Sequence, residues 1–146
     1  LHFNAVEWND CHDLVDDNRL IVFVHGDYLP AELNDDVQRL RLFQKLLERS
    51  HEIEQPLAQS LAASLGRATG LSPVVRPRNL AANRLYNGPV VYLEPYYMNN
   101  RTVYERLQLG DYEGEREVGG KKVKSIFREY DDAGLEGLRP YLAPRN

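Results

Sequence analysis

The sequence predicts an α/β domain in which a largely parallel or mixed, twisted sheet is flanked by helices. Two continuous apolar runs, at 20–25 and 89–94, are rich in β-branched and aromatic residues, as expected of strands buried on both faces. The segments between and after them carry apolar residues at helical spacing, and strands separated by helices are typical of this class. The 146 residues suffice for one core, so we expect a single domain at 1–146, with a core at about 1–134 and a tail at 135–146.

The first half of the chain contains one strand and two long helices. The run at 20–25 ends at Gly26, and a helix at 35–49 follows, which Asn34 or Asp35 can cap. The apolar face of this helix is predicted to be buried and consists of Val37, Leu40, Phe43, Leu46 and Leu47. A second helix is expected at about 54–69, with Pro56 in its first turn and Gly70 after its last.

The second half of the chain is expected to alternate shorter elements with loops. In chain order these are an extended segment at Val74-Val75, a short helix at 79–86, the strand at 89–94, a helix at 101–109, a glycine-rich charged loop at 111–122, a last helix at 123–133 and the tail from Gly134. Leu1–Ala5 has the pattern of a strand end that runs into a loop. We therefore expect that the N-terminal strands of the sheet are missing from this chain and that it is a fragment or a processed product.

The composition is that of a folded protein and argues against several classes of partner. Apolar residues make up 42% of the chain and charged residues 27%, with a net charge of -4. No apolar run approaches the ~20 residues of a membrane-spanning helix. Nucleic acid is not the expected partner, because phosphate binding needs a clustered basic surface. Cys11 is the single cysteine, so neither an internal disulfide nor a multi-cysteine zinc site can form.

Two residues are candidates for chemistry because of where they stand relative to predicted strands. His2 follows a strand end and can bind a metal at the edge of the sheet, although a surface histidine has the same pattern. Glu94 ends a buried strand, and ligands of open α/β sheets bind at the carboxyl ends of strands. Glu94 is therefore either a catalytic acid or base, or a residue that marks the exposed end of its strand.

Together these segments resemble the zinc-dependent N-acetylmuramoyl-L-alanine amidases, which hydrolyse peptidoglycan. Leu1-His2-Phe3-Asn4-Ala5 is similar to the family segment that supplies a zinc ligand. The run from Val91 to Glu94, with Tyr97 and Asn100 after it, is similar to the family's late strand that ends in a glutamate followed by an aromatic residue and an asparagine. The order of the motifs agrees over residues 1 to about 110, whereas Pro95 and Tyr96 depart from the usual residues and 27–49 has the appearance of an insertion.

The resemblance implies a zinc hydrolase in which His2 is a ligand of Zn²⁺ and Glu94 is the catalytic acid and base. It also implies that Asn4, Tyr97 and Asn100 contact the substrate, that peptidoglycan is the partner and that a monomer suffices. The family's other two zinc ligands precede the His2 segment, so this chain is expected to lack them. The substrate places the protein in the periplasm or outside the cell. The alternative is an inactive amidase-like domain that binds peptidoglycan or regulates a cell-wall partner.

The remaining histidines have simpler interpretations. His25 ends the first predicted strand and is expected to be a hydrogen-bonded core or edge residue. His51 is expected to lie between two helices, as a solvated residue or a cap. His12, next to Cys11, has no suitably spaced partner pair for a metal. Tyr97 and Tyr96 are equally compatible with a sugar-binding or peptide-binding groove and with packing.

Overall fold

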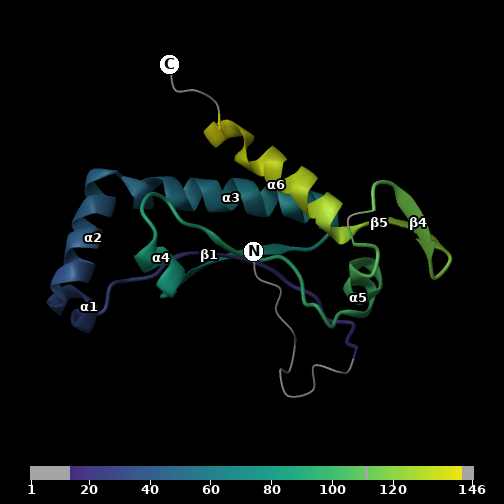
Figure 1. The fold of residues 1–146 in the computed structure, drawn as a ribbon, viewed down its shortest axis with the longest axis horizontal. Coiled ribbons are helices and arrows are strands. Elements are labelled where there is room, and N and C mark those ends of the chain that lie inside the picture. Colours follow the sequence, from purple (N-terminus) through teal and green to yellow (C-terminus); the bar gives the residue numbers. More distant parts are fainter. Residues whose placement is uncertain (1–13, 111, 143–146) are drawn as a thin grey trace.

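The computed structural model describes residues 14–110 and 112–142 and shows an α/β fold (Figure 1). Its sheet has three strands in the order β2-β1-β3. The central strand β1 (Leu20–His25) is parallel to β2 (Pro73–Arg78) and antiparallel to β3 (Tyr92–Glu94). The prediction of a mixed sheet with flanking helices is therefore confirmed, and the extended segment at Val74-Val75 is part of β2.

One face of the sheet is covered by the long helix α3 (Ser50–Thr69), as Figure 1 shows. Val22 and Val24 of β1 point to this face and form a cluster with Ala58 and Ala62 of α3. Alternate residues of a strand point to opposite faces, which explains how Leu20, Val22 and Val24 reach the same helix. Removal of these apolar side chains from water holds the sheet and α3 together.

Helix α6 (Ile126–Leu142) packs against α3, with Ala133 in a cluster with Leu20 of β1 and Leu65 of α3, and it extends well past its predicted end. Gly137 is buried directly against the backbone of Leu61, and the hydroxyls of Ser60 and Ser64 donate hydrogen bonds to the carbonyls of Gly137 and Ala133. The predicted tail from Gly134 is thus helical as far as Leu142. Gly137, which has no side chain, allows the close approach of α6 to α3 at this point.

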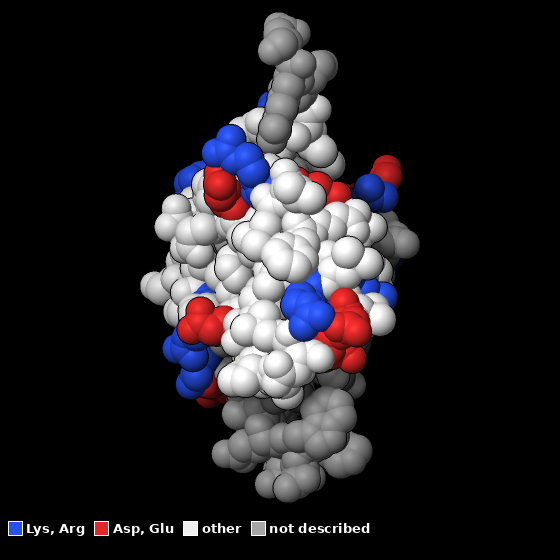
Figure 2. Space-filling model, turned by 90° about the vertical axis from the view of Figure 1, so that its left-hand side faces the viewer, with Lys and Arg blue, Asp and Glu red and all other residues white. Residues whose placement is uncertain are grey.

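Helix α2 (Asp36–Leu47) contradicts the prediction for its apolar face. The five predicted core residues, Val37, Leu40, Phe43, Leu46 and Leu47, are between 54% and 86% exposed, whereas Lys45 is only 2% exposed. Together with the short helix α1 (Pro30–Asn34), α2 lies at one end of the molecule and beyond the sheet, so its apolar side is not packed on the core. Figure 2 shows that end of the molecule, where uncharged surface is bordered by charged side chains.

The shorter elements follow the predicted order, with one difference. Helix α4 (Ala81–Leu85) precedes β3, and α5 (Arg101–Leu107) follows it. The predicted loop at 111–122 contains a hairpin of β4 (Glu115–Val118) and β5 (Lys121–Lys124). Gly119 and Gly120 both have positive φ and form its two-residue turn, a conformation that glycine adopts without steric cost. Among the described helices, none combines the length and apolarity needed to span a membrane.

Candidate functional site

Two histidines and a glutamate from different parts of the chain meet at one end of β1. His25 is the last residue of β1, and His51 and Glu54 lie in the first turns of α3. Because α3 begins at Ser50, earlier than predicted, His51 lies on the helix and not between helices. Residues three apart lie on the same helix face, so both α3 side chains point to His25. We call these three residues the histidine–glutamate cluster.

In the histidine–glutamate cluster, the Nδ1 atoms of both histidines lie close to the same carboxylate oxygen of Glu54. Nδ1 of His25 is 2.5 Å from Oε2 of Glu54, and Nδ1 of His51 is 3.1 Å from the same atom. The two imidazole rings are stacked, with 3.7 Å between their centroids. The three ligand atoms all lie within 4.8 Å of one another.

Neighbouring residues contact the side chains of Glu54 and His51 on the sides that face away from the cluster. The second oxygen of Glu54, Oε1, accepts a hydrogen bond of 3.0 Å from the Val90 amide and lies 4.0 Å from Nζ of Lys45. The Tyr28 hydroxyl lies 3.2 Å from Nε2 of His51. Every atom of Glu54 that can accept a hydrogen bond therefore has a donor or a cation nearby, as a fully buried carboxylate requires.

The environment sets the protonation states of the cluster. Burial acts to raise the pKa of the Glu54 carboxyl, but the hydrogen bonds from Val90, His25 and His51 outweigh it and the net pKa is lowered. Burial lowers the pKa of His51, although the contact with Glu54 opposes this shift. At neutral pH the cluster thus presents a carboxylate next to a neutral His51 imidazole.

These residues can hold a metal ion. Two imidazole nitrogens and one carboxylate oxygen form the ligand set of many three-ligand metal sites, in which water or substrate takes a further position. Sequence interpretation missed this site because it assigned His25 and His51 separately to structural roles. The signal that could have revealed it is the His51-x-x-Glu54 spacing at a helix start, together with a histidine that ends a neighbouring strand.

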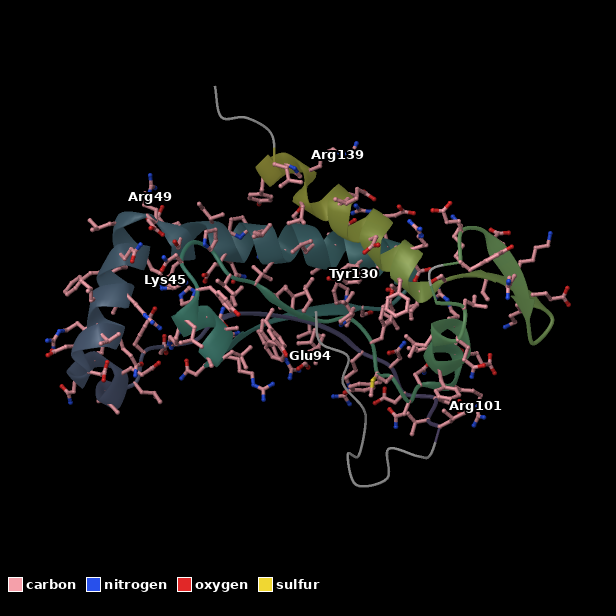
Figure 3. The ribbon with its side chains drawn as sticks, viewed as in Figure 1. Lys45, Arg49, Glu94, Arg101, Tyr130 and Arg139 are labelled. Carbon is pink, nitrogen blue, oxygen red and sulfur yellow. The ribbon has the colours of Figure 1, made fainter. Side chains whose placement is uncertain are left out.

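Glu94, the predicted catalytic residue, lies at a different place on the sheet. It ends β3, pairs with Ile21 of β1, and is 7% exposed. His25 is four residues further along β1 than Ile21, so Glu94 and the histidine–glutamate cluster are at different ends of this strand. Figure 3 shows the same separation between Glu94 and Lys45, the residue next to Glu54.

Asn100 and Tyr97, the predicted substrate contacts, lie on the loop after Glu94 and contact the segment at 16–18. Asn100 caps α5 by accepting a hydrogen bond from the Val103 amide, and it donates hydrogen bonds to the carbonyls of Asp16 and Asp17. Tyr97 is partly buried, and its amide donates to Oδ1 of Asn18. His2 and Asn4, the predicted zinc ligand and substrate contact, lie outside the described residues.

Comparison with known proteins adds no assignment to these observations. No protein-family model matches the chain, and a search of curated proteins gives no match.

Proposed function

We propose that the protein is a zinc-dependent N-acetylmuramoyl-L-alanine amidase that hydrolyses peptidoglycan in the periplasm or outside the cell. The observation that carries the proposal is Glu94, a nearly buried carboxylate at the carboxyl end of the edge strand β3. Glutamate is rarely buried unless it is paired or functional. The resemblance to the amidases implies that Glu94 is the catalytic carboxylate.

The path of the chain after its N-terminal motif supports this proposal. The amide of Val15 donates to the carbonyl of Asn99, and the carbonyl of Val15 accepts from the amide of Arg101. The contacts of Asn100 with residues 16 and 17 continue this pairing. Residues 15–17, near the start of the described part of the chain, therefore lie directly against the loop that follows Glu94.

In the proposed reaction Glu94 moves protons. Zinc held by His2 and by the other two ligands that the resemblance implies would acidify a water molecule and polarise the amide carbonyl. Glu94 accepts a proton from the attacking water and later delivers it to the nitrogen of L-alanine, which leaves as an amine. Tyr97, on the loop after Glu94, is the described residue that we propose to contact the muramoyl peptide.

The test measures release of dye-labelled fragments from purified peptidoglycan. The protein is expressed from its complete gene, so that every zinc ligand that the proposal requires can be present. We expect that Glu94→Gln lowers the rate by at least about 100-fold, since general acid–base catalysis contributes ~10²–10⁴. A chelator should have a similar effect.

The matched control is Glu105→Gln, because Glu105 is exposed on α5 and should not be required. Thermal melts of the variants separate lost catalysis from lost folding. Hydrolysis that continues in Glu94→Gln and in chelator rejects the proposal. Binding of peptidoglycan without hydrolysis by the wild-type protein supports instead the inactive, peptidoglycan-binding alternative.

A further inference from the structure

We propose that His25, His51 and Glu54 form a binding site for a divalent transition-metal ion of the zinc type, separate from the proposed catalytic centre at Glu94. The site lies where β1, α2 and α3 meet, and Lys45, at the C-terminal end of α2, reaches it. An ion bound there would connect the central strand to the first turns of the longest helix.

The positions of the ligand atoms are close to those that a bound ion needs. Ligand atoms at ~2.1 Å from a tetrahedral zinc ion lie roughly 3.4 Å apart. Nδ1 of His51 is already 3.1 Å from Oε2 of Glu54, while Nδ1 of His25 is 2.5 Å away. These two separations are within about 1 Å of the separation in a zinc site, and the two histidine nitrogens lie within 4.8 Å of each other. The backbones that carry the three side chains are fixed by a strand and a helix.

The residues around the cluster have the arrangement expected of groups that orient metal ligands. Ligand histidines usually engage a hydrogen-bond partner through their second ring nitrogen, and Nε2 of His51 has the Tyr28 hydroxyl in this position. A ligand carboxylate is held through its other oxygen, and Oε1 of Glu54 accepts from the Val90 amide. These contacts leave Nδ1 and Oε2 as the atoms that face the ion.

The cluster is also accessible to an ion from solvent. The side chain of His25 is 29% exposed, whereas Glu54 is fully buried. An ion can therefore approach along His25 and retain a water molecule as its further ligand. The ammonium group of Lys45, 4.0 Å from Glu54, repels the ion and lowers the affinity of the site.

The competing explanation is a hydrogen-bonded network without a metal. A carboxylate oxygen can accept two hydrogen bonds, so both Nδ1–H groups can donate to Oε2 of Glu54. This network needs neither an ion nor the exposed edge of His25. The two explanations differ in one measurable property, which is saturable binding of a metal ion that depends on both histidines.

The test is a titration with Co²⁺, followed by visible absorption, and with Zn²⁺, followed by calorimetry. The 146-residue chain is used with His2→Ala, so that the proposed catalytic ligand does not contribute. We expect one equivalent of bound metal, and at least about tenfold weaker binding in His25→Ala, His51→Ala and Glu54→Gln. Glu52→Gln is the matched control, because Glu52 is an exposed carboxylate in the same turns of α3 and should leave binding unchanged.

Two further measurements keep the test decisive if a ligand variant does not fold. Lys45→Met should strengthen binding, because it removes the competing positive charge. In the chain whose only substitution is His2→Ala, addition of Zn²⁺ should shift the Nδ1 resonances of His25 and His51 in imidazole ¹⁵N spectra. Absence of saturable binding, or binding that leaves both Nδ1 resonances unchanged, overturns the proposal. Loss of hydrolysis in Glu94→Gln bears only on the amidase proposal, so the two can fail independently.

Discussion

At the scale of single residues, buried charges organise the end of the molecule where the histidine–glutamate cluster lies. Arg84 of α4 donates to the carbonyls of Gly26 and Asp27 and to Glu32 of α1. Its guanidinium also lies over the ring of Tyr28, 3.9 Å from the ring centroid. Because Tyr28 contacts His51, Arg84 connects α1 and α4 to the cluster through one side chain.

We predict that Arg84→Met lowers the free energy of unfolding by about 1–3 kcal/mol at pH 7, because the change leaves the partly buried carbonyl of Gly26 and carboxylate of Glu32 without a donor. The hydrogen bond from Arg84 lowers the pKa of Glu32, so this pair stabilises the fold above the ordinary carboxyl pKa and loses that contribution as the pH falls below it. The difference between wild type and variant should therefore be smaller at pH 3 than at pH 7. Urea denaturation at both pH values measures it.

Arg76→Met is the matched control for this prediction, since Arg76 is exposed on β2. Its effect should stay within about 0.5 kcal/mol at either pH. An Arg84→Met variant that is as stable as this control would show that the contacts of Arg84 contribute nothing.

At the scale of elements, the packing of α6 on α3 depends on a glycine. A Cβ atom at position 137 would lie 3.0 Å from Cα of Leu61 and 3.2 Å from the carbonyl oxygen of Ser60. At position 134 the nearest atom would be Cε1 of Tyr130, 4.0 Å away. A side chain at position 137 would therefore collide with α3, whereas position 134 has room for one.

We predict that Gly137→Ala and Gly134→Ala change stability in opposite directions. Gly137→Ala should cost about 1–3 kcal/mol, since the backbone of α3 cannot yield without moving the helix. Gly134→Ala should stabilise by up to about 1 kcal/mol, because alanine has the higher helix propensity and meets no obstacle. Thermal or urea denaturation of the two variants compares them directly. Equal effects of the same sign would contradict the observed helix contact.

At the scale of the whole molecule, apolar runs and spacing predicted the α/β class and most elements, but not which side of a helix is buried. The run at 20–25 forms the buried strand β1 as predicted, because continuous β-rich apolar segments have few alternatives. Of the run at 89–94, only 92–94 forms a strand, and it lies at the edge of the sheet and is partly exposed, not buried on both faces. The apolar side of α2 was assigned to the core, yet α2 lies beyond the sheet and buries Lys45. A hydrophobic pattern specifies a side of a helix but not where the helix is placed.

Of the two candidate sites, one could be predicted from a local sequence pattern and the other depends on tertiary contacts. The position of Glu94 at a strand end is a local property and was predicted. The histidine–glutamate cluster arises because α3 begins at Ser50 and brings His51 and Glu54 to the end of β1, although Glu54 is 29 residues from His25 in the chain. The His51-x-x-Glu54 spacing places these two residues on one face of a helix, but only the fold shows that this face meets His25.

The central claim, that the protein cleaves the bond between N-acetylmuramic acid and L-alanine, is tested most directly by identifying the products. Purified peptidoglycan is digested with the protein expressed from its complete gene, and the released fragments are analysed by mass spectrometry. Our account predicts stem peptides that begin with a free L-alanine amine, and glycan strands whose muramic acids carry free lactyl carboxyls. Fragments cut within the glycan or within the peptide, or no fragments above those of the Glu94→Gln variant, would contradict it.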